Sequence, residues 1–160
     1  MSGHDETSEQ WWGSRESPTK PIAVTSHDAT TVRLASGIAA VYITTPVCEA
    51  GTMFLDAGKT TKVFSFEATD DGTADEWHGA AYEFYYVLAG ELTVHFGTDV
   101  DKIRRKESEF IVVRTGEFAR YMPGFKYAVT CTSRQPGTFL WVKNASPAGT
   151  VERLITSTPA

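Results

Sequence analysis

The hydrophobic positions of this chain fall in short runs that alternate with turn residues. From about Lys20 onward, runs rich in Val, Ile, Thr, Phe and Tyr recur at intervals of about ten residues. No segment of eleven or more residues has the apolar spacing of an amphipathic helix. Short β-branched and aromatic runs of this kind are typical of an all-β sandwich or barrel. The expected strands are TTVRLA, AAVYITT, TMFLDAG, TTKVFSFEA, AYEFYYVLAG, ELTVHFG, EFIVVRTGE, FKYAVTCT, TFLWVKN and VERLITS.

Alternation within these runs assigns their two faces, because successive residues of a strand point to opposite sides of a sheet. In FKYAVTCT the apolar row places Tyr127 on the inward face. In ELTVHFG the polar row places His95 on the solvent face. Since His4 lies near the N-terminus and His27 in the turn-like SHDAT, His78 remains as the candidate site histidine.

The run AYEFYYVLAG is apolar on both of its rows. We expect the inward row to be Glu83, Tyr85 and Val87, and the outward row to be Tyr82, Phe84, Tyr86 and Leu88. A strand that is apolar on both rows is expected to be covered on both. The outward row therefore predicts a homodimer, in which a second subunit buries these rings. The alternative is that Trp11 and Trp12 of the N-terminal arm pack on them.

Length and composition are those of one globular domain. The chain has 160 residues, of which 41% are hydrophobic, enough for one sizeable core. Residues 1–20 are polar and lack a periodic apolar pattern, which predicts a flexible N-terminal arm before a single domain at 21–160. Cys48 and Cys131 have neither metal-ligand nor redox spacing, so both are expected to be free.

The charge of the chain bears on its partners. The formal net charge is -5, and the longest basic run is KIRRK at 102–106, which we interpret as a solvated strand or turn. Neither feature suits nucleic acid or an anionic membrane as partner. No apolar stretch approaches the ~20 residues of a membrane span, and the N-terminus lacks the apolar segment of a secretory signal. The sequence predicts a cytosolic protein whose partner is a small molecule.

Polar groups open the stretch DEWHGAAYEFYYVLAG, which begins at Asp75. Glu76 and His78 flank one residue, Glu83 follows His78 after four intervening residues, and Gly90 follows Glu83 after six. About 25 residues further on, a second set of spaced residues consists of Gly116, Glu117, Gly124 and Tyr127.

These two motifs resemble those of the cupins, small jelly-roll barrels built from two sheets. In the family's motifs, histidines stand where this chain has Glu76 and Tyr127, whereas His78 and Glu83 match. The resemblance covers roughly residues 60–145 and implies an all-β, cupin-type double-stranded β-helix. GELTV and FLWVKNASPA also resemble the cupins of ethanolamine utilisation, in which the usual metal histidines are largely missing.

The resemblance implies that Glu76, His78, Glu83 and Tyr127 project into the barrel mouth as catalytic residues. One alternative is a weak centre for Mn²⁺, Fe²⁺ or Zn²⁺ with Glu76, His78 and Glu83 as metal ligands. A second is a metal-free pocket, in which two nearby carboxyls share the roles of general acid and general base. A third leaves Glu76 facing water outside the site.

Two more residues are candidates for substrate contacts. Tyr85 shares the face of Glu83, and Arg120 could bind a substrate carboxylate. The expected function is a small enzyme of the isomerase, cyclase or lyase type, acting on an oxygenated metabolite (polyketide-like, aromatic or an oxo-acid) by acid–base or weak-metal chemistry. The alternatives are a non-catalytic ligand-binding cupin of the ethanolamine-utilisation type and a metal-dependent oxidoreductase or dioxygenase.

Overall fold

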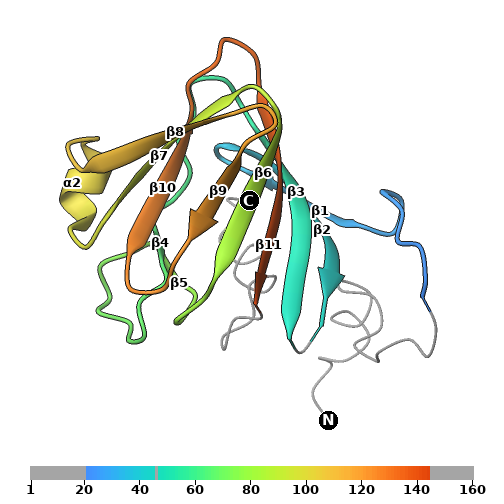
Figure 1. The fold of residues 1–160 in the computed structure, drawn as a ribbon, viewed down its shortest axis with the longest axis horizontal. Helices are drawn as coiled ribbons and strands as arrows, with labels where there is room; N and C mark the ends of the chain where they lie inside the picture. The colour runs from blue at the N-terminus through green and yellow to red at the C-terminus, as the bar shows by residue number, and fades with distance from the viewer. Residues whose placement is uncertain (1–20, 46, 145–160) are drawn as a thin grey trace.

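Two sheets, mostly antiparallel, make up nearly all of the regular secondary structure in this computed structural model, which describes residues 21–45 and 47–144 (Figure 1). The first sheet has six strands in the order β1-β2-β3-β11-β6-β9, and the second has five in the order β5-β4-β10-β7-β8. The strands of the first sheet are β1 (Thr30–Leu34), β2 (Gly37–Thr44), β3 (Cys48–Leu55), β6 (Glu83–Ala89), β9 (Phe118–Tyr121) and β11 (Gly137–Asn144). Those of the second are β4 (Phe64–Ser65), β5 (Glu76–Trp77), β7 (Glu91–Gly97), β8 (Glu109–Arg114) and β10 (Lys126–Cys131).

The prediction of an all-β fold is confirmed. Alternation along most strands builds the core between the two sheets, because one row is buried while the other faces outward; β10 is buried along its whole length. The core rows of β6, β10 and β11 supply Tyr85, Val87, Tyr127, Val129, Cys131, Phe139 and Trp141. Tyr127 lies on the inward face as predicted, and Cys48 and Cys131 are free.

A short helix corrects part of the interpretation of the basic run at 102–106: residues 102–104 are helical, whereas residues 105 and 106 form a turn and the basic side chains are exposed, as expected. Helix α2 spans Val100–Arg104, and the side chain of Asp99 caps its first turn by accepting hydrogen bonds from the N–H groups of Asp101 and Lys102. Val100 and Ile103 lie one turn apart and pack on Val63 and Ala128. Burial of these two apolar side chains, together with the cap, favours the helix over a solvated strand.

His95 was expected on the solvent face, and that prediction is wrong. The residue points away from the main core, but only 7% of it is exposed. Its strand partners are Ala128 on β10 and Phe110 on β8, and its ring lies 5.5 Å from that of Phe110. Because α2 contacts β7 and β10, the outer face of this sheet is covered locally rather than wet.

The outward row of β6 faces away from the core, as the alternation predicted. Tyr82, Phe84 and Leu88 are 59%, 37% and 47% exposed. Phe118 of β9 continues this apolar surface, with its ring 4.7 Å from that of Tyr86. The arm at 1–20 with Trp11 and Trp12, and the run VERLITS expected near the C-terminus, lie outside the described residues. Within the described part of the chain, no helix is long and apolar enough to span a membrane.

Candidate functional site

A cavity of about 260 Å³ lies between the two sheets. Most of its lining is apolar, and five of the lining residues carry aromatic rings other than histidine. Ionisable side chains reach it from both sheets, which makes it the candidate functional site. The lining residues are Leu34, Ala35, Ser36, Ala39, Met53, Thr60, Thr61, Lys62, Phe64, Phe66, Glu76, His78, Glu83, Tyr85, Phe139, Trp141 and Lys143.

Glu76 and His78 enter the cavity from the five-stranded sheet. They alternate around Trp77 on the edge strand β5, so both point the same way, and each is 5% exposed. His78 Nε2 lies 3.5 Å from Glu76 Oε2, and the imidazole packs edge-on against the rings of Phe64 and Phe66. Burial by itself would raise the pKa of Glu76, but His78, with a smaller effect of Lys62, lowers it below the ordinary value.

Glu83 enters from the six-stranded sheet as part of a row of ionisable side chains across three adjacent strands. Lys143 on β11 pairs in register with Glu83 on β6 and with Glu49 on β3. Lys143 Nζ lies 2.6 Å from Glu49 Oε2, and both side chains are almost fully buried. We call Glu49, Lys143 and Glu83 the cross-strand triad.

The cross-strand triad holds one carboxyl in its neutral form near neutral pH. Burial raises the pKa of Glu83 to about 8; the charge of Lys143 opposes this shift and the charge of Glu49 adds to it. Glu76 and Glu83 therefore have pKa values that are displaced in opposite directions, although both line one cavity.

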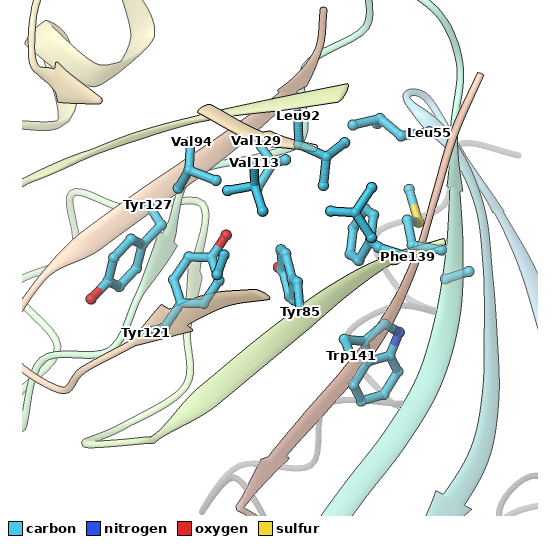
Figure 2. Close-up of a cluster of buried hydrophobic side chains, with 14 of the residues drawn as sticks. Leu55, Tyr85, Leu92, Val94, Val113, Tyr121, Tyr127, Val129, Phe139 and Trp141 are labelled. Atoms are coloured by element: carbon cyan, nitrogen blue, oxygen red, sulfur yellow. The ribbon is translucent and has the colours of Figure 1, made fainter. Parts of the chain in front are cut away.

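A row of contacting aromatic rings runs from the core to the wall of the candidate site. Tyr127, Tyr121, Tyr85 and Phe139 follow one another with centroid separations of 4.5, 4.6 and 4.3 Å. Figure 2 shows Tyr121 between Tyr127 and Tyr85, with Trp141 at the opposite end of the cluster. Tyr85 lines the cavity, as its position on the face of Glu83 predicted.

The structure places two of the sequence-predicted site residues away from the cavity. Tyr127 is not among the lining residues; its hydroxyl donates to the carbonyl oxygen of Met122 at 2.6 Å, which fixes the turn before β10. Arg120 is exposed and pairs with Phe84 on the outer face of the six-stranded sheet. The alternation of side chains along β9 explains this, because Ala119 and Tyr121 occupy the inward positions. Arg120 is therefore not a contact for a molecule in this cavity.

The donor groups do not fit the metal centre that the cupin resemblance implies. Among residues 21–45 and 47–144, no three histidine, cysteine, aspartate or glutamate side chains lie close enough together to hold a metal ion. Glu76 and His78 form a pair, but Glu83 lies on the other sheet beside Lys143, whose positive charge disfavours a cation there. The three expected metal ligands are thus not assembled into one site.

An ion cluster around the buried ammonium of Lys126 holds the loop that leads into β5. The ammonium of Lys126 on β10 lies 2.6 Å from Glu67 Oε2 and 2.9 Å from Asp71 Oδ2. The carbonyl oxygen of Glu67 in turn accepts a hydrogen bond of 2.8 Å from Nε1 of Trp77. Trp77 lies between Glu76 and His78, so these contacts fix the backbone from which both site residues project.

The arrangement of sheets and cavity defines a jelly-roll sandwich with its candidate site between the sheets. Comparison with solved structures supports this assignment of the fold. The cupin domain of Cnp3 from Schizosaccharomyces pombe is similar over 79% of this chain and 75% of its own (TM-score 0.53, 11% identity). A predicted oxalate decarboxylase from Thermotoga maritima is similar over 78% and 99% (TM-score 0.55, 16% identity). KdgF from Halomonas sp. is similar over 78% and 94% (TM-score 0.56, 12% identity).

These similarities establish the fold: the described part of the chain has a cupin-type fold. No protein-family model matches the sequence, and no curated protein gives a significant match to it. Sequence identities of 11 to 16% support a conclusion about the fold alone, so the chemistry of the cavity has to be inferred from its own residues.

Proposed function

We propose that this cupin is an enzyme that moves protons on a small oxygenated metabolite, as an isomerase, cyclase or lyase without a metal centre. The observation that carries the proposal is the placement of buried ionisable side chains on two facing walls of one mostly apolar cavity. A molecule between the sheets would have the Glu76–His78 pair on one side and Glu83 on the other. Such a placement suits an enolisable carbonyl compound.

The protonation states support a division of roles between the two carboxyls. Glu76 has a lowered pKa and is ionised near neutral pH, so it suits the general base that removes a proton from the carbon beside a carbonyl. Glu83, with its pKa raised to about 8, keeps a proton that it can donate to the carbonyl oxygen. The product of the step is the enol, with the abstracted proton on Glu76 and Glu83 ionised; transfer of the Glu76 proton to another carbon, with return of the enol hydroxyl proton to Glu83, completes an isomerisation.

The lining gives further support for a substrate that carries a flat or apolar portion. Phe64, Phe66, Tyr85, Phe139 and Trp141 surround the cavity with aromatic rings. An apolar lining excludes water and strengthens every electrostatic interaction inside it. Oxo-acids, cyclic ketones and aromatic metabolites of the polyketide type have both the enolisable group and the apolar surface.

Proton–deuterium exchange tests the proposal on a range of candidate carbonyl compounds. A panel of small oxo-acids, cyclic ketones and hydroxylated aromatic ketones is incubated with the protein in D₂O, and loss of the proton next to the carbonyl is followed by NMR. We expect exchange with the wild type, and its loss in Glu76→Gln and Glu83→Gln while both remain folded. Glu109→Gln, at an exposed position of β8, is the matched control and should exchange like the wild type.

The second candidate function is a non-catalytic ligand-binding cupin of the ethanolamine-utilisation type. The mostly apolar cavity favours it, because such a lining can hold a molecule without reacting with it. The same panel separates the two candidates. Saturable binding of a compound with no exchange of its protons would contradict the enzyme and support the binding module.

A further inference from the structure

The cross-strand triad contains a cation that the proton-transfer step does not use. Lys143 continues the inward row of β11 after Phe139 and Trp141, and it lines the cavity. Glu49 does not line the cavity; it lies beside Lys143 on the neighbouring strand β3, with its Oε2 atom 2.6 Å from the Lys143 ammonium. An ion pair with a neighbouring carboxylate holds a buried ammonium in position.

The neighbours of Lys143 in the cavity are a carboxyl and rings. Glu83 is its in-register partner on β6, and Tyr85 is the partner of Trp141 in the next inward pair of the same two strands. Because Lys143 lines the cavity, its positive charge acts on a ligand that is held there. Lys143 and the Glu83 carboxyl would then donate together to one oxygen atom, at the end of an aromatic slot.

We propose that Lys143 is the oxyanion-binding residue of this cavity, and that the ligand is a small flat molecule whose anionic oxygen lies against Lys143 while its ring contacts Trp141 and Tyr85. The inference deepens the proposed function, on which it rests, by naming the substrate class: carbonyl compounds whose enolate is conjugated with a ring. Donors placed where negative charge develops stabilise an enolate during its formation.

The charge of Glu49 modulates this role. Glu49 offsets the positive charge of Lys143, so the pair is close to neutral when the cavity is empty. Removal of the Glu49 charge should leave a stronger net positive field at the cavity wall. Lys62 supplies a useful contrast, because it also lines the cavity but lies near Glu76 and its side chain is 40% exposed, which screens its charge.

Binding of 4-nitrophenol tests the proposal, since its phenolate absorbs at longer wavelength than its phenol and thus reports ionisation as well as affinity. Benzoate and nitrobenzene, titrated by calorimetry, serve as a carboxylate and as a neutral ring of similar size. We expect the wild type to bind 4-nitrophenol as the phenolate, and Lys143→Met to weaken binding of the phenolate and benzoate roughly 10- to 100-fold. Nitrobenzene should bind both proteins alike, and Lys59→Met, at an exposed position outside the cavity, should match the wild type.

Glu49→Gln keeps the test decisive if Lys143→Met does not fold. It retains the ammonium and removes the opposing charge, so phenolate affinity should rise several-fold. Equal phenolate affinity in the wild type and both variants, or a loss confined to Lys62→Met, would overturn the role of Lys143. Absence of proton exchange in the panel above would refute the enzyme while leaving oxyanion binding intact, so the two proposals fail by different measurements.

Discussion

The substitution Glu83→Gln should change how the free energy of unfolding depends on pH. Burial raises the pKa of Glu83 to about 8, from an ordinary value of 4.5. Between these two pKa values, the carboxyl therefore stays protonated in the folded protein while it is ionised in the unfolded chain. Because the unfolded state then binds fewer protons than the folded state, stability falls as pH rises from the unfolded pKa to the folded pKa.

The size of this effect follows from the two pKa values. One proton contributes a slope of at most about 1.4 kcal/mol per pH unit. Over a rise from about pH 5.5 to about pH 7.5, the ionisation of Glu83 lowers the free energy of unfolding by about 2 to 3 kcal/mol. Glutamine resembles the protonated carboxyl and does not titrate, so the variant should lose this component of the pH dependence.

Urea denaturation followed by tryptophan fluorescence across this pH range measures the difference. We expect the free energies of unfolding of the two proteins to change in parallel at the acid end of the range and to diverge as pH rises. Glu83→Gln should be the more stable protein near pH 8. Glu109→Gln should retain the wild-type slope, because that side chain is exposed. Parallel curves for the wild type and Glu83→Gln would refute a neutral Glu83 and with it the general acid of the proposed mechanism.

Three other outcomes are expected. The outward rings of β6 predict a homodimer: light scattering should give twice the 17.6 kDa chain mass, Phe84→Glu should give monomers or aggregates, and a monomeric wild type would contradict the prediction. Gly51→Ala should unfold at markedly lower temperature in calorimetry, because its Cβ would lie 2.2 Å from the carbonyl oxygen of Ala40 and 2.6 Å from the Trp141 ring; an unchanged midpoint would contradict this packing. Metal analysis of protein purified without chelator should find no stoichiometric transition metal; one that disappears in His78→Ala would overturn the metal-free mechanism.

The fold and half of the candidate site were accessible from the sequence because they depend on local periodicity. Alternation with a period of two placed Glu83, Tyr85 and Tyr127 on inward rows, and motif spacing singled out Glu76 and His78. The same reasoning could not separate inward residues that line the cavity from inward residues that fill the core. Tyr127 is of the second kind, since Tyr121 lies between it and Tyr85 (Figure 2).

Lys143 and Glu49 were not identified as site residues from the sequence, for physical reasons. A lysine near the end of TFLWVKN resembles a solvated strand terminus, although its place after Phe139 and Trp141 in the alternation was a usable signal. Glu49 precedes Gly51, which suggests a break in the strand, whereas β3 begins at Cys48 and passes through it. Their contact also depends on the order β3-β11-β6, which no local pattern contains.

The two walls of the cavity differ in how readily evolution could alter them. Glu49 and Lys143 form an ion pair across neighbouring strands inside a six-stranded sheet, so a change at either one leaves a buried charge on the other without its counter-charge. Glu76 and His78 belong to a two-residue edge strand and the residue after it, joined to the rest of the protein by a loop that Lys126 and Trp77 tie down. Substitutions in that loop can exchange the reactive pair without disturbing the sheet, so descendants of this chain could acquire a new reaction while they keep the same preference among substrates.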